Sequence, residues 1–115
     1  MVAERYQGFC VGTSAALLAN RDRILQFAAR QKLPAVYARR EYVDAGGLLY
    51  YGVDLGAMYL RLADYVHRIA QGAKPAQLPV ESPSIVRMAV NLKTARAQGI
   101  RIPKSILVRA DEVIE

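Results

Sequence analysis

The alternation of hydrophobic and polar residues is most regular in the middle of the chain, where it has the period of a helix. From Leu55 to Ile69 apolar side chains recur every three or four residues, the spacing that places them on one face of a helix. Asp54 suits the amino-terminal cap, and Gly72 suits the turn that ends a helix. The pattern therefore predicts a helix from about Asp54 to Gln71. Its apolar face consists of Leu55, Met58, Tyr59, Leu62, Val66 and Ile69.

Short apolar runs elsewhere predict four strands. The first, at 9–12, is predicted to be buried. The second, at 35–37, follows a helix that Asn20 can cap and that Pro34 ends, because a residue before proline is disfavoured in the helical conformation. Strand, helix and strand within about 30 residues form a βαβ unit, so these two strands should pair in parallel. The other two strands are expected at 48–52 and 86–90.

The carboxyl-terminal half adds a connector and short helices. Residues 73–83 contain three prolines and few apolar side chains, which predicts an extended connector. Asn91 can cap a helix that Gly99 ends, and Pro103 opens a last helical turn. Residues 110–115 are expected to form a charged tail. Strands separated by helices predict the α/β class, with a short, mainly parallel sheet flanked by helices.

Composition excludes several classes of protein. The 115 residues are 53% hydrophobic and carry a formal net charge of +6, which fits a packed domain. With Cys10 the single cysteine and His67 the single histidine, we predict no disulfide, no metal site and no cofactor. No run approaches the roughly 20 apolar residues of a membrane span. The first residues lack the apolar region of a signal peptide, so the sequence as written predicts a cytoplasmic chain.

Several segments, in one collinear order, carry a resemblance to a known family. In the first half they are Leu33–Tyr37, Arg40–Val43, Ala45–Leu48 and Tyr51–Gly52. In the second half they are Ile69–Pro79, Val90–Ala95, Gly99–Ile100, Ile102–Pro103 and Arg109–Ile114. Together they resemble the ABC-transporter substrate-binding protein family, in its branch related to tryptophan- and tyrosine-binding lipoproteins. The resemblance covers residues 9–115.

The resemblance implies part of a periplasmic-binding-protein fold of type I, which is Rossmann-like. That fold has two α/β lobes and holds its ligand in the cleft between them. Residues 1–45 would belong to the second lobe together with the hinge loop. Residues 46–115 would supply a hinge strand, the long helix, the connector and a final βα segment, all within one compact domain. Full-length relatives work with an ABC permease and are periplasmic or extracellular.

The polar segment before the two adjacent glycines suggests a site for an amino-acid-like solute or an organic anion. Arg39 or Arg40 can bind a carboxylate through two hydrogen bonds, and Glu41 can accept from an amine. Tyr42 belongs to the same segment. Tyr51 is the second of two neighbouring strand tyrosines, which face opposite sides, so it can stack on an aromatic or apolar ligand. The alternatives are a surface ion-pair cluster and two tyrosines packed beneath helices.

Two further pairs complete the candidate site. Thr13 and Ser14 follow the first strand, where the family places small polar residues facing the cleft, and their hydroxyl groups can bind a carboxylate. A loop that satisfies its own hydrogen bonds is the alternative. Gly46 and Gly47 are interpreted as a conformational requirement, because no phosphate-binding P-loop spacing surrounds them.

Two functions remain open at this point. The first is a solute-binding component of an ABC-type uptake system, or its C-terminal fragment, acting without chemistry; the residues give no active site, so we predict no enzyme. The alternative is a structural protein that forms a homodimer, either through its exposed sheet edge or by exchanging elements about the 73–83 connector. Basic residues are scattered along the chain rather than gathered in one stripe, so nucleic-acid binding is not predicted.

Overall fold

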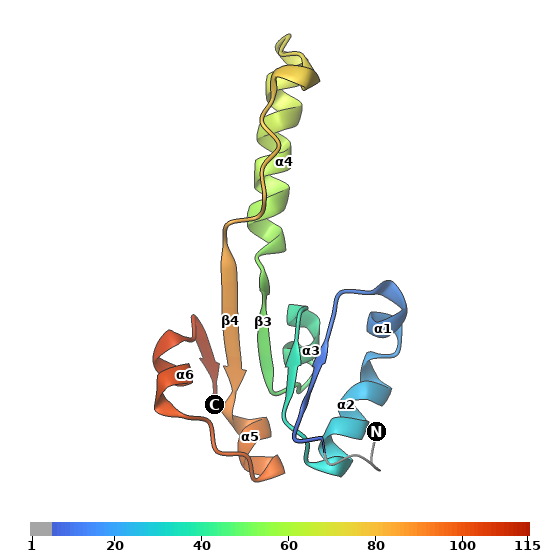
Figure 1. Cartoon of the computed structure of the whole chain (residues 1–115), viewed down its shortest axis with the longest axis vertical. Coiled ribbons are helices and arrows are strands. Elements are labelled where there is room, and N and C mark those ends of the chain that lie inside the picture. The colour runs from blue at the N-terminus through green and yellow to red at the C-terminus, as the bar shows by residue number, and fades with distance from the viewer. Residues whose placement is uncertain (1–5) are drawn as a thin grey trace. The chain divides into compact units, whose positions relative to one another are not determined.

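The computed structural model describes residues 6–115 (Figure 1). The chain divides into two compact units, one formed by the residues up to Gly52 together with Arg87–Glu115, and the other by Val53–Val86. Each is described by itself.

A five-stranded sheet with the strand order β1-β2-β3-β4-β5 lies at the centre of the first unit. Parallel pairing joins β1 to β2, β2 to β3, and β4 to β5. At the centre, the amide of Asn91 donates to the carbonyl of Leu48 at 2.9 Å, so the end of β4 lies beside the start of β3 and the two strands run in opposite directions. The strands are β1 (Phe9–Val11), β2 (Ala35–Tyr37), β3 (Leu49–Val53), β4 (Val86–Asn91) and β5 (Glu112–Ile114).

Helices cover both faces of this sheet. Side chains of α1, α2 and α3 pack in one cluster with Val11, Ala35 and Tyr37. Side chains of α5 and α6 pack with Leu49 and Val90 in a second cluster on the other face. The mostly parallel, doubly covered sheet confirms the predicted α/β class. The helices of this unit are α1 (Ala15–Ala19), α2 (Arg21–Gln31), α3 (Arg40–Asp44), α5 (Leu92–Gln98) and α6 (Lys104–Arg109).

Two stacked tyrosine rings belong to the first cluster. The rings of Tyr37, on β2, and Tyr42, on α3, lie 4.7 Å apart with an interplanar angle of 13°, and both residues are buried. Burial, with a smaller contribution from Tyr42, raises the pKa of the Tyr37 hydroxyl to about 12. Gly47 packs against this pair: a Cβ there would lie 2.8 Å from both the Tyr37 ring and the carbonyl oxygen of Tyr42. A side chain at position 47 would therefore force the Tyr37 ring or the Tyr42 backbone to move.

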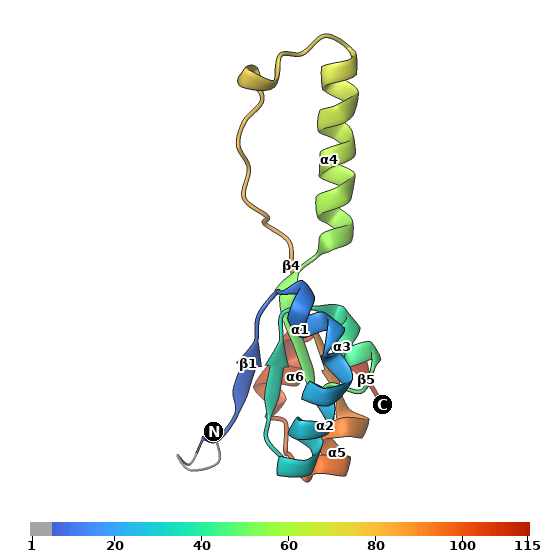
Figure 2. The same ribbon diagram turned by 90° about the vertical axis from the view of Figure 1, so that its right-hand side faces the viewer.

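The second unit consists of one long helix, α4 (Leu55–Ala70), a short 3₁₀ turn (Pro75–Gln77) and an extended segment that returns along α4 (Figure 2). Asp54 accepts a hydrogen bond from the amide of Ala57 at 3.0 Å, and Gly72 has a φ of 103° after the helix. The predicted cap, length and end of this helix are therefore confirmed. No residue between 53 and 86 is buried.

The structure corrects several of the sequence-based expectations. The sheet has five strands rather than four, because residues 112–114 pair with β4 instead of forming a tail. The first strand is an edge strand, so Cys10 is exposed rather than buried. Asn20 does not cap α2 with its side chain; its Nδ2 donates to the carbonyl of Ala16 in α1 at 2.9 Å, a helix the periodicity did not predict.

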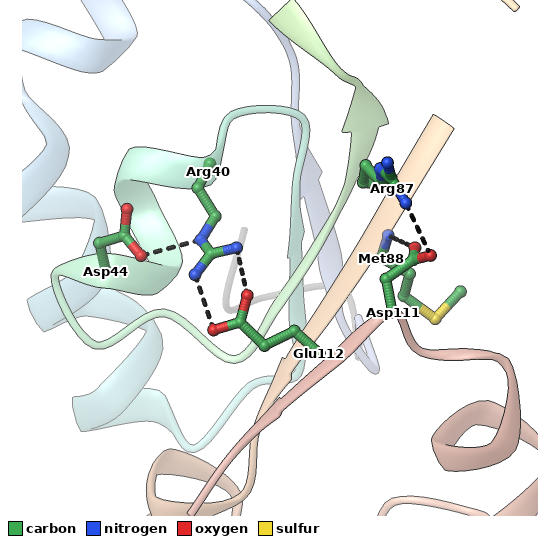
Figure 3. Close-up of polar contacts among 6 residues, drawn as sticks. All are labelled: Arg40, Asp44, Arg87, Met88, Asp111 and Glu112. Atoms are coloured by element: carbon green, nitrogen blue, oxygen red, sulfur yellow. Dashed lines mark hydrogen bonds and ion pairs between the residues drawn. The ribbon is translucent and has the colours of Figure 1, made fainter. Parts of the chain in front are cut away.

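Polar contacts hold β5 against the sheet (Figure 3). The amide of Met88 donates to the Asp111 carboxylate at 2.8 Å, and the amide of Asp111 donates to the carbonyl of Met88 at 2.9 Å. Arg87 lies 3.4 Å from the same carboxylate. The hydrogen bond from Met88, followed by that from Arg87, lowers the pKa of Asp111.

The packing at the glycine pair gives the first prediction. Gly47→Ala should lower the free energy of unfolding by about 1–3 kcal/mol, because the added methyl group overlaps buried backbone and ring atoms. Gly12→Ala is the matched control, since its Cβ would meet nothing within 4 Å, and it should change stability by less than about 0.5 kcal/mol. Urea unfolding followed by circular dichroism measures both. Equal stability of the two variants would contradict the packing argument.

The second prediction concerns pH. Asp111→Ala should lower the midpoint of thermal unfolding at neutral pH, because the amide of Met88 loses its carboxylate partner. The pKa of Asp111 lies below its ordinary value of 3.8 in the folded chain, so its contribution is complete above pH 3.8 and disappears as the pH falls through the folded pKa. The gap between wild type and variant should therefore close on acidification below pH 3.8. A gap that widened there would exclude this role.

Candidate functional site

The parallel strands β1, β2 and β3 end side by side, and their carboxyl ends form one edge of the sheet, called here the strand edge. The amide of Ala38, just after β2, donates to the carbonyl of Val11 at the end of β1, at 3.0 Å. On the other side, Gly52 in β3 approaches so closely that a Cβ there would lie 2.6 Å from the Ala38 carbonyl oxygen. Residues that follow these strands are therefore brought together, and ligands of open α/β sheets bind at this edge.

Thr13 and Ser14 leave the end of β1 and are exposed. Ser14 occupies the cap position of α1, where its carbonyl accepts from the amide of Leu18 at 2.9 Å, but its side chain makes no cap hydrogen bond. Thr13 and Ser14 are thus exposed to solvent at the strand edge.

Arg39 and Glu41 form an ion pair at the beginning of α3, after the end of β2. Arg39 Nε donates to Glu41 Oε2 at 3.2 Å, and a second hydrogen bond joins Arg39 Nη2 to Glu41 Oε1. The Arg39 hydrogen bonds are the main cause that lowers the pKa of Glu41, which keeps this carboxylate charged at neutral pH. Both side chains remain partly exposed.

Arg40, the next residue, interacts with carboxylates of the chain itself (Figure 3). Its guanidinium donates to both oxygens of Glu112 at 2.7 and 3.0 Å and to Asp44 at 2.8 Å. These hydrogen bonds, with Glu112 contributing most, raise the pKa of Arg40. Arg40 therefore links α3 to β5.

The remaining residues of the predicted segment lie elsewhere. Tyr42 has no exposed surface and stacks on Tyr37. Gly46 and Gly47 precede β3 and so lie toward the opposite edge of the sheet. Gly46 has a φ of 102° and its carbonyl accepts from the Thr94 hydroxyl at 2.8 Å. These contacts are structural, in agreement with the conformational interpretation of the glycines.

The two strand tyrosines face opposite sides, as the period of a strand requires. Tyr50 is buried and Tyr51 is 53% exposed. Tyr51 precedes Gly52, the residue that contacts Ala38 at the strand edge. The structure thus brings Thr13, Ser14, Arg39, Glu41 and Tyr51 to the edge where β1, β2 and β3 end.

Sequence reasoning missed two features. Asp111 lies just before β5 and Glu112 begins it, instead of forming a charged tail; the β-branched pair Val113-Ile114 is the feature of the sequence that favours a strand there. A cavity of about 330 Å³ in the second unit is lined by α4 and by residues 81–85, and none of the predicted site residues lines it. Its polar wall is an ion pair in which Arg61 donates to Glu81 at 2.6 and 2.7 Å.

Within residues 6–115, no group of three or more His, Cys, Asp and Glu side chains is arranged to hold a metal ion. In the same range no helix combines the length and hydrophobicity needed to cross a bilayer.

Known structures resemble this chain over nearly all its length. A conserved domain protein from Vibrio cholerae is 26% identical, with a TM-score of 0.87, and the match covers 97% of this chain and 38% of that one. The ABC domain in complex with L-Trp from Streptococcus pneumonia is 25% identical, with a TM-score of 0.85 and coverages of 98% and 38%. A ligand-free, open substrate binding protein with adhesive properties from Clostridium difficile shares the fold at 19% identity, with a TM-score of 0.64 and coverages of 91% and 35%.

The chain therefore spans less than two fifths of the length of these structures. No curated protein matches it significantly. The family model for ABC transporter substrate binding proteins matches residues 1–114, which agrees with the collinear segments noted in the sequence. The chain belongs to the ABC transporter substrate binding protein family.

Proposed function

We propose that this chain provides one wall of the solute site of an ABC-type uptake system, and that the solute is amino-acid-like. The observation that carries the proposal is the partly exposed Arg39–Glu41 pair at the edge where three parallel strands end. One positive and one negative group, two residues apart, match the opposite charges of an amino acid.

The chemistry of the pair fits both ends of such a solute. Guanidinium binds carboxylate through two parallel hydrogen bonds, and a carboxylate accepts from an ammonium group. Glu41 stays ionised at neutral pH because Arg39 lowers its pKa. A solute with both a carboxylate and an ammonium group can bind without leaving Arg39 or Glu41 unpaired. An unpaired charged side chain would be costly in a closed site.

Neighbouring residues complete the wall. The hydroxyl groups of Thr13 and Ser14 can add hydrogen bonds to the solute carboxylate, and the exposed ring of Tyr51 offers a face for an apolar or aromatic side chain. A relative 25% identical to this chain was crystallised with L-Trp, which supports a solute of this class. Arg40 and Tyr42 are assigned to the support of the site, since one binds Glu112 and the other is buried.

Family membership also supports the remaining parts of the proposal. The protein binds its solute without chemical change, works outside the cytoplasmic membrane and delivers the solute to an ABC permease. The chain spans about 38% of the length of these relatives, so the proposal assigns to it one wall of the solute site and not the whole cleft.

Nuclear magnetic resonance titration of the isotope-labelled chain tests this proposal. L-tryptophan should shift the amide signals of residues 12–14, 39–41 and 51, with a dissociation constant of about 1 mM or weaker because only one wall is present. Tryptamine lacks the carboxylate and indole-3-acetate lacks the amine, so each should bind more weakly. Arg39→Ala should weaken L-tryptophan binding about tenfold, through the lost charged hydrogen bonds.

Arg30→Ala is the matched control, because Arg30 is an exposed arginine of α2, and it should leave the titration unchanged. Shifts spread over the whole chain, or equal losses in the two variants, would contradict a site at the strand edge. Stronger binding of indole-3-acetate than of L-tryptophan would replace the amino-acid assignment with an organic anion.

A further inference from the structure

The hydroxyl group of Tyr42 is buried and has no hydrogen-bond partner within residues 6–115. The ring of Tyr42 supports the sheet by stacking on Tyr37, but this contact leaves the hydroxyl unpaired. A buried hydroxyl without a partner costs free energy, and such a group in a folded protein calls for an explanation. We propose that the Tyr42 hydroxyl donates a hydrogen bond to the carboxylate of the bound solute, beside Arg39. This role rests on the proposed function and adds to it a specificity-determining residue.

Arg39 and Tyr42 lie on the same side of the first turn of α3. The amide of Tyr42 donates to the Arg39 carbonyl at 3.3 Å, and residues three positions apart in a helical turn are neighbours on its surface. Glu41 directly precedes Tyr42, and adjacent residues of a helix do not face each other. The Glu41 carboxylate is held at Arg39 by the ion pair. A solute carboxylate that takes the place of Glu41 at Arg39 is therefore brought to the side of α3 that carries Tyr42.

The charges around the Tyr42 hydroxyl favour a negatively charged partner. Burial raises the pKa of this hydroxyl, and the positive charges of Arg21 and Arg39 act in the opposite direction. The charge of Glu41 raises the pKa further, so the hydroxyl is protonated at neutral pH and can donate. Arginine side chains carry donors only, so neither arginine can accept this hydrogen bond. Beside two positive charges, a carboxylate is the acceptor with the most favourable charge.

A partner can reach the hydroxyl only when side chains of the site move. The hydroxyl is already enclosed by residues of this chain, so another stretch of polypeptide packed against the surface would not contact it. A zwitterionic solute does cause such a movement, because it separates Arg39 from Glu41 and binds one of its charged groups to each. The hydrogen bond from Tyr42 is therefore made in the bound state and is absent from the free chain. Its loss should lower affinity without lowering stability.

Nuclear magnetic resonance titration of Tyr42→Phe tests this role, because the substitution removes the hydroxyl and keeps the ring. L-tryptophan and indole-3-acetate should each bind about five- to tenfold more weakly than they bind to the wild type, since both lose a hydrogen bond to a charged carboxylate. Tryptamine has no carboxylate, so its affinity should be unchanged. The three ligands thus distinguish a hydroxyl that binds the solute carboxylate from one that binds Glu41.

Tyr37→Phe is the matched control. It removes a hydroxyl from the other ring of the same stack, where burial and the neighbouring Tyr42, rather than the charges of the site, raise the pKa. This variant should bind all three ligands as the wild type does. A loss of L-tryptophan affinity equal to that of Tyr42→Phe would overturn the assignment to Tyr42.

Urea unfolding in the absence of solute gives a second measurement that does not depend on binding. Tyr42→Phe should unfold at the same urea concentration as the wild type or at a higher one, because the free chain loses no hydrogen bond and no longer buries an unpaired hydroxyl. A lower midpoint would show that the hydroxyl has a partner in the free chain, and it would overturn the proposal.

The titrations separate failure of this role from failure of the proposed function. If the wild type binds L-tryptophan and Tyr42→Phe binds it equally well, the role of the hydroxyl is overturned and the solute site stands. An equal loss for tryptamine and indole-3-acetate would also overturn it, because the hydroxyl then does not act on the carboxylate. A wild-type chain that binds none of the three ligands would overturn both proposals.

Discussion

The stacked rings of Tyr37 and Tyr42 determine how the chain passes from β2 to β3. The ring centroids of Tyr37 and Tyr42 lie 4.7 Å apart. Because this contact holds Tyr42 against the sheet, α3 has to begin immediately after β2. Arg39 and Glu41, on either side of that beginning, are therefore fixed at the strand edge. The same pair of tyrosines lies so close to position 47, where the chain turns into β3, that any side chain there would displace buried atoms. One buried contact thus sets both the polar pair and the turn that follows it.

Elements with strong local signals could be predicted, and elements that depend on distant contacts could not. The helices α4 and α5 carry capping residues and a terminal glycine, and their caps form as expected from Asp54 and Asn91. The missed helices α1 and α3 have five residues each, too few to show a period. The strand β5 has three, and its pairing with β4 and the bond from Arg40 to Glu112, 72 positions away, are invisible in local sequence.

Part of the candidate site could likewise be predicted from local sequence, and part depends on contacts between distant residues. The polar residues that follow the first two predicted strands could be named from the sequence, and the fold places Thr13, Ser14, Arg39 and Glu41 where β1 and β2 end. It could not distinguish Arg39 from Arg40, since adjacent residues of one type differ only in the partners that the fold gives them. Glu112 binds one of them and Glu41 the other. The chemistry available to a solute thus depends on a tertiary ion pair made at the far end of the chain.

The Arg39–Glu41 pair also bears on which solutes the proposed site accepts. A simple anion that binds Arg39 competes with Glu41 for the guanidinium, and it places a second negative charge beside that carboxylate. A zwitterion can insert its carboxylate at Arg39 and its ammonium group at Glu41, so every charge keeps a partner of opposite sign. An unpaired charge costs more as water is excluded from the cleft, so the advantage of the zwitterion should grow when the second wall closes. On the proposed function, a preference for amino acids over organic anions would follow from the ion pair that Arg39 and Glu41 form with each other in the free chain.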